Sequence, residues 1–457
     1  MRVFKRYVSA RNLTVFVAEV ILMLSAIIIA ARLHGSLDDL YSSLWKIVFV
    51  SVLCQITLYY NDFYDLTLVH SDRETIVRLL QAAGAVSILL AVVYVVIPSL
   101  QLGNGVFVTF LGLFLFGVLA WRLAFNRVAG VRQLEERILI LGKGNGARTV
   151  AEYILSQHAF GYHVVGFVDD DPASVGTEVG SWRVIGTPAE MKRLIEEEGI
   201  DRIIVGLTDR RGKLPVEELM RAKLSGVRVE DAMTTYERLA GKILLDDLRP
   251  SWLIFSSDFN VLRFTRLTKR LFDVAGALLG LVLALPLMGL TALLVRLGSG
   301  RPVLYAQDRV GENGRVFTLY KFRSMRADAE NGTPLWAKDD DERVTPVGRF
   351  IRNFRLDEMP QLWNVLRGDM SFVGPRPERP FFDEYLCAQI PFYRQRHAVK
   401  PGITGWAQVK YRYGSSIEDS TEKLRYDLYY IKYLSLIFDM SILVDTVKVI
   451  LFSKGAK

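Results

Sequence analysis

Four long apolar stretches dominate the first 130 residues of the chain. They cover residues 13–33, 44–60, 76–100 and 106–125, and most of the charged residues lie between them. Each approaches the ~20 residues that a helix needs to cross a bilayer core ~30 Å thick. The first is too long for a signal peptide and lacks a cleavage site of small residues. The pattern therefore predicts a bundle of four membrane-spanning helices over residues 1–130.

Basic residues at the ends of these stretches indicate how the bundle is oriented. They precede the first stretch, lie near the second loop and follow the fourth stretch: Arg2, Lys5, Arg6, Arg11, Arg73, Arg78, Arg122, Arg127 and Arg132. The short loop 101–105 has none. Because Lys and Arg concentrate on the cytoplasmic side, we expect the N-terminus and everything after residue 130 to lie there.

Residues 131–262 change to short apolar strands that alternate with amphipathic helices. RILILG, HVVGFV and IDRIIVGL are typical of strands, and AEMKRLIEEEG of a helix. This alternation predicts a Rossmann-like α/β module. Gly142, Gly144 and Ala147 fit GxGxxG/A between a strand and a helix, and Asp169 ends the next strand. Such a turn can bind a nucleotide phosphate, but the glycines can equally serve only a tight turn.

A further apolar block, LFDVAGALLGLVLALPLMGLTALLVRLG, opens a third domain over residues 263–457. Pro286 lies near its middle, where proline removes a helix hydrogen bond and kinks the helix. Basic residues flank both ends, which favours the same side of the membrane for both. We therefore predict a re-entrant helix at about 271–297. The alternative is a straight fifth span, which would place the following residues outside the cell.

The C-terminal stretch DLYYIKYLSLIFDMSILVDTVKVILFSK combines an apolar face with interrupting charges. The apolar face at helical spacing consists of Leu436, Met440, Leu443, Val444 and Val447. This pattern is typical of an amphipathic helix at the membrane interface. A core-facing helix of a soluble domain is the alternative.

The segment RVTPVGRFIRNFRLDEMPQLWNVLRG predicts two helices separated by a break. Thr345 is a typical N-cap, and Pro346 suits the first helical position. Pro360 interrupts the helix at the preceding residue. A second helix would then end at Gly368, since glycine commonly follows the last turn. The break would let neighbouring side chains line one cavity and would expose backbone N–H groups there.

Asp357 and Glu358 lie beside this break, in a segment with seven arginines and four acids between residues 343 and 379. Adjacent acids repel, which raises one pKa unless arginines or a divalent cation allow both to ionise. Such a site suits a phosphate substrate. One carboxylate can form an acyl phosphate, the other can hold Mg²⁺, and arginines can bind phosphate oxygens. The alternative is a solvated helix face with ion pairs.

The composition of the chain limits the partners and the kinds of metal or disulfide site that can be expected. The net charge of +8 favours anionic partners such as lipids, phosphorylated substrates or nucleic acid. Only two cysteines and five scattered histidines occur, so a disulfide framework, a cysteine zinc site or a histidine-rich metal centre is not expected.

Several long motifs resemble the monotopic phosphoglycosyl transferases, a family of bacterial sugar transferases. They are LYKFRSM, RVTPVGRFIRNFRLDEMPQLWNVLRGDMSFVGPRPE, VKPGITGWAQV and YDLYYIKYLSLIFDM, and the resemblance covers about residues 267–451. With a four-helix bundle and a Rossmann-like module before a mainly α catalytic domain, the chain resembles the large members of this family. It is also similar to the sugar transferases of exosortase-linked exopolysaccharide systems.

The resemblance implies a two-step transfer of a sugar 1-phosphate from a UDP-sugar to undecaprenyl phosphate, which starts exopolysaccharide or O-antigen synthesis. Asp357 would carry the phosphosugar after UMP leaves, and Glu358 matches the position that binds Mg²⁺. The location implied is the cytoplasmic face of the bacterial inner membrane. The expected partners are both substrates, membrane lipids and a second copy of the chain, without nucleic acid.

The resemblance also assigns further site residues. Basic positions expected at phosphate or nucleotide are Lys321, Arg323, Arg352 and Arg376. Pro375 and Pro377 would shape the loop around Arg376, and the PGITG turn would close the pocket. An acid near the C-terminus also features in the family, and either Asp427 or Asp439 fits.

Two other classes of function compete with this one. A membrane-anchored, NAD-dependent nucleotide-sugar dehydratase or epimerase would need a Tyr-x-x-x-Lys pair, and the sequence has none. A non-catalytic membrane sensor could instead bind a nucleotide in the α/β module. The sequence does not distinguish glucose, galactose and N-acetylated sugars as the group transferred.

Overall fold

The computed structural model describes residues 2–3, 6–7, 10–34, 44–60, 63, 72–101, 105–129, 135–156, 161–207, 214–245, 263–326, 342–411, 414 and 416–452. Within it the chain divides into two compact units, which consist mainly of Tyr7–Thr235 and Tyr236–Lys457. Both predicted domain boundaries, after residues 130 and 262, fall outside the described residues.

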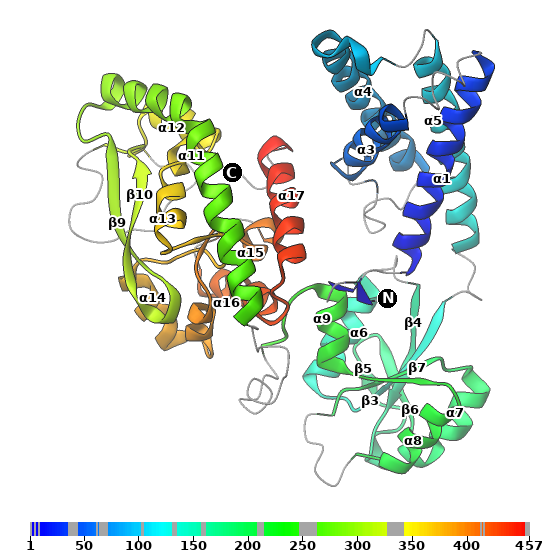
Figure 1. Cartoon of the computed structure of the whole chain (residues 1–457). Helices are drawn as coiled ribbons and strands as arrows, with labels where there is room; N and C mark the ends of the chain where they lie inside the picture. Colours follow the sequence, from blue (N-terminus) through cyan, green and yellow to red (C-terminus); the bar gives the residue numbers. More distant parts are fainter. Residues whose placement is uncertain are drawn as a thin grey trace. The chain divides into compact units, whose positions relative to one another are not determined.

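The four helices predicted from the first apolar stretches are present (Figure 1). Following two short strands, β1 (Arg2–Val3) and β2 (Arg6–Tyr7), they are α1 (Ala10–Leu33), α3 (Leu44–Tyr60), α4 (Asp72–Val96) and α5 (Val106–Ala129). Segments of α1, α4 and α5 are long and apolar enough to cross a membrane, whereas α3 is shorter, at 17 residues. The one-turn helix η1 (Pro98–Leu100) follows α4.

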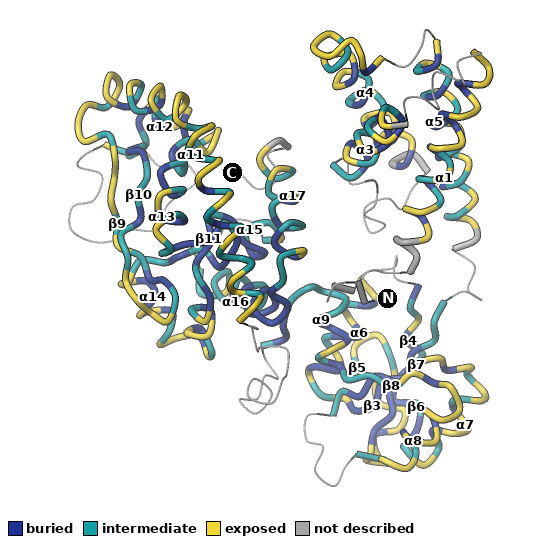
Figure 2. Tube along the Cα trace, in the orientation of Figure 1, coloured by how far each residue is buried: buried dark blue, intermediate teal, exposed yellow. Residues whose placement is uncertain are grey.

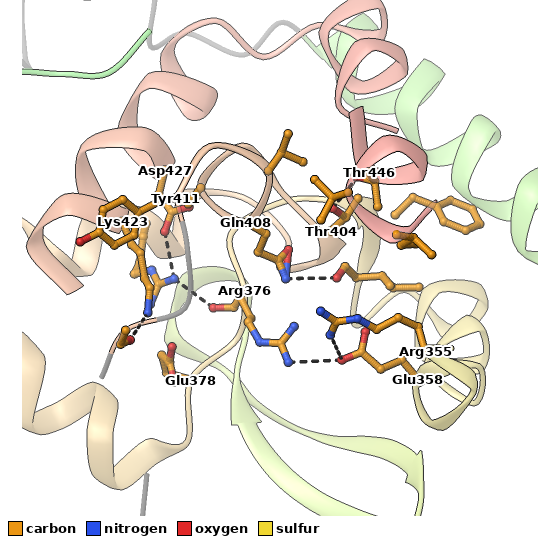
Figure 3. A pocket seen from close by; sticks show the side chains of 18 of the residues that line it. Arg355, Glu358, Arg376, Glu378, Thr404, Gln408, Tyr411, Lys423, Asp427 and Thr446 are labelled. Carbon is orange, nitrogen blue, oxygen red and sulfur yellow. Dashed lines mark hydrogen bonds and ion pairs between the residues drawn. The ribbon is translucent and has the colours of Figure 1, made fainter. Parts of the chain in front are cut away.

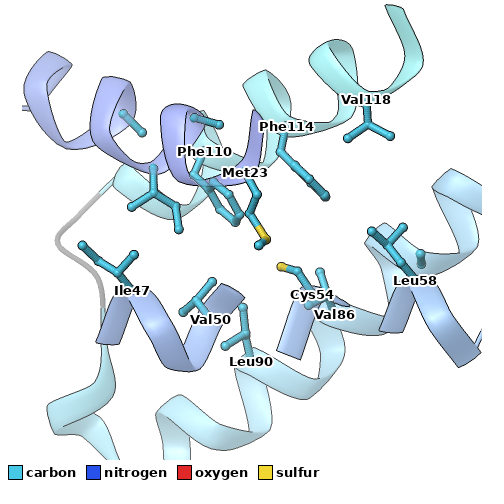
Figure 4. Close-up of a cluster of buried hydrophobic side chains, with 14 of the residues drawn as sticks. Met23, Ile47, Val50, Cys54, Leu58, Val86, Leu90, Phe110, Phe114 and Val118 are labelled. Carbon is cyan, nitrogen blue, oxygen red and sulfur yellow. The ribbon is translucent and has the colours of Figure 1, made fainter. Parts of the chain in front are cut away.

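These helices pack around a shared apolar core (Figure 4). Met23, Val50, Leu90 and Phe110, one from each helix, are all buried. Many other apolar side chains of the same helices remain exposed on the outside. Apolar residues on both the inner and the outer face are what a helix bundle surrounded by lipid requires.

The predicted α/β module contains a six-stranded sheet in the order β5-β6-β4-β3-β7-β8. Its strands are β3 (Glu136–Leu141), β4 (Tyr162–Val168), β5 (Glu178–Val179), β6 (Trp182–Gly186), β7 (Arg202–Val205) and β8 (Arg228–Asp231). Its helices are α6 (Asn145–Ser156), α7 (Met191–Glu198), α8 (Val216–Leu224) and α9 (Ala232–Ala240), with single turns η4 (Pro172–Ser174) and η5 (Pro188–Glu190). All pairings are parallel except β5 with β6, so the sheet is mixed.

The second unit is mainly helical, with two small sheets (Figure 1). Its first half contains α11 (Arg263–Ser299), the antiparallel hairpin β9 (Leu304–Val310) and β10 (Val316–Phe322) with η7 (Glu312–Gly314) between them, α12 (Pro346–Asn353), η8 (Leu356–Glu358) and α13 (Gln361–Arg367). The rest contains β11 (Ser371–Val373) parallel to β12 (Gly402–Thr404), α14 (Pro380–Gln389), η9 (Tyr393–Ala398), α15 (Trp406–Lys410), α16 (Ile417–Lys432) and α17 (Leu436–Phe452).

Helix α11 exposes many apolar side chains. It has 37 residues with Pro286 inside, and its ribbon changes direction along its length in Figure 1. Most of its leucines are exposed, including Leu279 and Leu283 (Figure 2). The bend fits the kink predicted from the proline. The helix is also long enough to cross a membrane, so its re-entrant course stays a prediction.

Basic residues at the start of α11 hold the segments around the candidate site. Arg270 donates hydrogen bonds to the carbonyls of Val365 (2.6 Å) and Leu366 (2.7 Å), near the end of α13. Lys269 donates to the carbonyl of Val373 in β11 (3.0 Å). Cations suit the C-terminal end of a helix, where backbone carbonyls lack partners. Of these two basic residues beside the apolar block, Arg270 therefore fixes the end of α13 and Lys269 holds β11.

The end of α9 and the residues after it belong to the second unit. Glu237 is fully buried and accepts hydrogen bonds from Lys432 (2.8 Å) and Tyr433 (3.0 Å). Trp406 donates through its indole N–H to the carbonyl of Gly241 (2.7 Å). The chain that leaves the α/β module thus supports α15 and α16, two helices that line the candidate site.

Candidate active site

The break that precedes the acid pair, Asp357 and Glu358, lies at Arg355, one residue before η8. Thr345 caps α12 by accepting a hydrogen bond from the N–H of Gly348 (2.9 Å), as predicted. The helix ends at Asn353, and Arg355 adopts a left-handed backbone conformation with φ 56°. A left-handed arginine is uncommon and holds local strain. It redirects the chain so that the acid pair occupies a separate turn.

Three cations converge on one oxygen of Glu358, and Figure 3 shows two of them, Arg355 and Arg376. Its Oε1 lies 3.2 Å from Lys321 Nζ, 3.2 Å from Arg376 and 3.8 Å from Arg355. Burial alone acts to raise the pKa of this carboxyl, but the three cations outweigh burial and hold the pKa well below its usual range. Glu358 is therefore ionised at neutral pH.

Asp357 differs from its neighbour although the two are adjacent. Its side chain is buried. Burial raises the pKa of the Asp357 carboxyl, and the negative charge of Glu358 raises it further, against the opposing effect of Lys321, Arg352 and Arg355. Paired acids with divided pKa values are a common arrangement where two carboxylates have different tasks. The side chain with the raised pKa is also the more basic one, which suits a nucleophile.

The loop that carries Arg376 is held at three successive carbonyls. Gly402 N–H donates to Pro375 O (3.0 Å), Arg396 to Arg376 O (2.9 Å), and Arg309 to Pro377 O (3.1 Å). Both prolines are buried. With its backbone held in this way, the loop directs the Arg376 guanidinium to Glu358.

The PGITG turn packs directly against this loop. A side chain at Gly402 would collide with the backbone of Gly374, and one at Gly405 would collide with the carbonyl of Gly374. Glycine is therefore required where the two strands β11 and β12 approach. The turn supports the wall of the pocket.

Glu358 lines a cavity of about 360 Å³, a size typical of small-molecule sites, whereas the adjacent Asp357 is buried and is not among the lining residues. Figure 3 shows Arg355, Glu358 and Thr446 at one end, and Tyr411, Lys423 and Asp427 at the other. Arg376 and Gln408 lie between the two ends (Figure 3). Apolar residues that line the cavity include Met359, Leu362, Phe372, Ile403, Val449 and Ile450.

The two candidate C-terminal acids occupy different places. Asp427 lines the cavity and forms a buried ion pair with Arg396 (2.9 Å). Asp439 is buried between Lys269 (2.5 Å) and the Tyr430 hydroxyl (2.8 Å) and does not line the cavity. The geometry therefore connects Asp427 to the site through Arg396 and the backbone of Arg376.

We expect Asp427→Asn to lower kcat/KM about 10- to 100-fold, because loss of its charge removes the ion pair with Arg396 and loosens the Arg376 loop. Asp439→Asn is the matched comparison. It should lower thermal stability but keep kcat/KM of the folded protein within a few-fold. Steady-state kinetics and thermal unfolding of both variants provide the measurement. Equal kinetic losses in the two variants would contradict the assignment.

Arg323 does not reach the acid pair. It is buried, and its guanidinium donates hydrogen bonds to the carbonyls of Ser299 and Arg301, just after α11. Arg352 forms no hydrogen bond or ion pair with the acid pair within the described residues, but it lies close enough to lower the pKa of Asp357. Of the four basic residues assigned from the resemblance, Lys321 and Arg376 contact the acid pair directly.

The glycine turn of the α/β module has its own internal partner. Asp169 accepts from Ser174 (2.9 Å) and pairs with Lys143 (2.8 Å), a residue of the turn itself. Gly142 has φ 93°, and a side chain there would meet Leu207. Gly144 begins the turn into α6. These contacts supply a structural reason for the motif, since the carboxylate that would bind a ribose is engaged by the protein.

The three cations leave one oxygen of Glu358 available to a metal. Glu358 Oε2 accepts no hydrogen bond from any residue that the structure describes. No cluster of three His, Cys, Asp or Glu side chains suited to a metal occurs in the described part of the chain. The available oxygen of Glu358 is compatible with Mg²⁺. This ion commonly binds one or two carboxylates and completes its coordination shell with water and phosphate oxygens.

Sequence reasoning missed Arg396, Gln408, Lys423 and Tyr411. Gln408 lies within the quoted motif VKPGITGWAQV, but nothing in that motif marks its side chain as part of a cavity wall. Arg396 lies among several basic residues that the sequence alone does not rank. Only the packing of η9 against α16 identifies it.

Two models of known sequence families match the chain, one in each unit. The sequence model of the bacterial sugar transferase family matches residues 264–453, and that of a CoA-binding domain matches residues 59–214. A Rex-family repressor structure aligns over 27% of this chain and 68% of that chain, but its TM-score of 0.20 at 18% identity carries no argument.

Three curated relatives have related names. The UDP-N-acetylgalactosamine-undecaprenyl-phosphate N-acetylgalactosaminephosphotransferase of Aeromonas hydrophila is 41% identical over 52% of this chain and 56% of that protein. The undecaprenyl-phosphate glucose phosphotransferase of Komagataeibacter xylinus is 33% identical over 71% of this chain and 61% of that protein. The UDP-glucose:undecaprenyl-phosphate glucose-1-phosphate transferase of Caulobacter vibrioides is 41% identical over 42% of this chain and 72% of that protein.

The chain thus spans less than two thirds of the first two relatives and more than two thirds of the third. All three names describe transfer of a sugar phosphate to undecaprenyl phosphate. The family model covers the whole acid-pair segment, the Arg376 loop and the PGITG turn. The chain belongs to the bacterial sugar transferase family of undecaprenyl-phosphate sugar-phosphate transferases.

Proposed function

We propose that this protein transfers a sugar 1-phosphate from a UDP-sugar to undecaprenyl phosphate, releases UMP, and so initiates exopolysaccharide or O-antigen synthesis. The observation that carries the proposal is the acid pair with divided pKa values, of which Glu358 lines the cavity. Glu358 is held ionised by three cations, while burial raises the pKa of Asp357. The names of the relatives support the same pair of substrate classes.

In the first step, an Asp357 carboxylate oxygen attacks the β-phosphorus of the UDP-sugar. A new O–P bond forms, and the bond from that phosphorus to the bridging oxygen breaks. UMP leaves with the bridging oxygen and its electron pair, so the sugar phosphate remains on Asp357 as an acyl phosphate. Arg376 and Lys321 are placed to bind the diphosphate oxygens, since both already point their cations to the neighbouring carboxylate.

In the second step, an oxygen of undecaprenyl phosphate attacks the same phosphorus. The bond to Asp357 breaks, the carboxylate is regenerated, and polyprenyl-diphosphate-sugar is released. Glu358 Oε2 and substrate phosphate oxygens would hold Mg²⁺, which when bound neutralises negative charge on the diphosphate. Glu358 also keeps the cations around the site in place.

The membrane location follows from the two substrates. A UDP-sugar is dissolved in the cytosol, whereas a polyprenyl phosphate presents its phosphate at the lipid headgroups. We propose that α11 enters the cytoplasmic leaflet of the inner membrane and returns, and that α17 lies near the interface. The exposed leucines of α11 support this placement. A homodimer remains part of the proposal, with the α/β module as the candidate contact.

The pH dependence of the first step tests the assignment of Asp357. An acid with a raised pKa is protonated below that pKa and ionised above it, so UMP release should rise with pH and then level off. Arg352→Gln should move this rise to higher pH, because Arg352 lowers the pKa of Asp357. Arg349→Gln, an exposed arginine of the same helix, is the control and should leave it unmoved. If the pH profile of UMP release were the same in Arg352→Gln as in wild type, Asp357 would not be the group whose ionisation controls the first step.

A UMP-release assay of detergent-solubilised protein with Mg²⁺, undecaprenyl phosphate and a panel of UDP-sugars tests the activity itself. We expect release with at least one of the glucose, galactose and N-acetylated donors. Hydride exchange with NAD and no release of UMP would instead support the dehydratase or epimerase alternative. Full cellular function without Asp357 would support the sensor alternative.

A further inference from the structure

The cavity has an apolar wall besides the cations around Glu358. Val449 and Ile450 of α17 line it together with Leu362 of α13 and Phe372 of β11. Thr446, one turn before Val449, lies at the same end as Arg355 and Glu358 (Figure 3). A hydrogen bond between Thr446 and Thr404 (2.7 Å) ties α17 to β12 at this point.

The opposite end of the cavity is polar. Asp427, Lys423 and Tyr411 lie there (Figure 3). Between the two ends, the buried Oε1 of Gln408 has no hydrogen-bond partner among the described residues. A buried carbonyl oxygen without a donor favours a ligand that carries hydroxyl or N–H groups. The polar end therefore suits a sugar nucleotide, and the apolar end suits a different ligand.

The apolar wall is backed by α11, a helix with many exposed leucines. A side chain at Gly276 would lie 2.8 Å from the Phe372 ring, and one at Gly280 would lie 3.4 Å from Leu362. Glycines thus let α11 pack closely on the side chains that form the wall. The exposed leucines of α11, including Leu279 and Leu283, continue from this contact to the surface. A hydrocarbon chain that lies along α11 can follow apolar residues into the cavity.

We propose that this apolar wall binds the first isoprenoid units of the polyprenyl phosphate acceptor. The acceptor phosphate contacts Arg355 and Arg376, and the hydrocarbon lies between α13, β11 and the end of α17. The inference rests on the proposed function, and it places the two substrates at opposite ends of one cavity. Each CH₂ group that leaves water adds to affinity, so binding depends on the acceptor's chain as well as on its phosphate.

The test separates the two half-reactions in a Val449→Ser/Ile450→Ser double variant. With UDP-sugar alone, we expect the rate of adduct formation to stay within about twofold of wild type. Discharge of that adduct should need about tenfold more undecaprenyl phosphate for the half-maximal rate. Geranyl phosphate, which carries two isoprenoid units next to its phosphate, should lose affinity in the same direction, whereas methyl phosphate, which carries none, should change little. Val316→Ser, an exposed valine of β10, is the control and should change neither step.

Two results would overturn the inference. In one, the double variant discharges to undecaprenyl phosphate with wild-type concentration dependence. In the other, adduct formation falls as much as discharge, which would place the wall at the donor or in general stability. Absence of any adduct in wild-type protein is a separate outcome, because it contradicts the proposed function and removes the basis of the inference.

Discussion

Asp357→Ala is expected to reduce sugar-phosphate transfer by about four orders of magnitude or more, the scale on which loss of a covalent nucleophile acts in other enzymes. Without the carboxylate, the acyl phosphate cannot form and UMP cannot be released in the first step. UMP release and glycolipid formation with a matched UDP-sugar provide the measurement. The side chain is small and buried, so thermal unfolding of the variant shows whether the fold persists.

Asp369→Asn is the control for this change. Asp369 lies in the same segment and pairs with Arg367 (3.3 Å), and it is not among the groups that shift the pKa of Asp357 or Glu358. It should keep transfer within about twofold of wild type. An Asp357→Ala variant that folds and still transfers the sugar phosphate at more than a few per cent of the wild-type rate would rule out the aspartyl intermediate.

Glu358→Gln should lower kcat about 10²- to 10³-fold, with a smaller effect on folding than on transfer. The amide keeps the shape of the side chain but removes the charge that gathers Lys321, Arg376 and Arg355 on one oxygen. It also removes the carboxylate oxygen proposed to hold Mg²⁺. The Mg²⁺ concentration for half-maximal activity should therefore rise.

A titration of Mg²⁺ with UMP release as the readout checks this second expectation. Glu384→Gln changes an exposed glutamate of α14 in the same unit and should leave the titration unchanged. If Glu358→Gln lowers activity but leaves the Mg²⁺ dependence as in wild type, Glu358 acts by positioning the cations alone. If activity is also unchanged, the assignment of Glu358 is wrong.

The sequence predicts much of the local structure around the acid pair because the signals there are short-range. A capping threonine, a proline and a glycine fix where α12 begins and where α13 ends, and all three act within a few residues. The same holds for the bundle, where length and hydrophobicity decide the helices. The left-handed Arg355 has no such local signal, since arginine does not favour that conformation.

The sequence fails where a side chain chooses between partners that are distant along the chain. Arg323 stands in a basic motif, yet it binds backbone carbonyls near the end of α11 instead of the acid pair. Asp169 satisfies a dinucleotide motif, yet Lys143 from the same turn occupies it. Residue type limits what each group can bind, but only tertiary packing selects the partner. Asp427 and Asp439 are indistinguishable in sequence for the same reason.

The most direct test of the central claim is the intact mass of wild-type protein after incubation with Mg²⁺ and a UDP-sugar that the enzyme accepts in the UMP-release assay. The lipid acceptor is left out. We predict a mass increase equal to one sugar phosphate, which peptide mapping places on Asp357 and which undecaprenyl phosphate removes. UMP release in full turnover without any such adduct, or an adduct on another residue, would contradict the account.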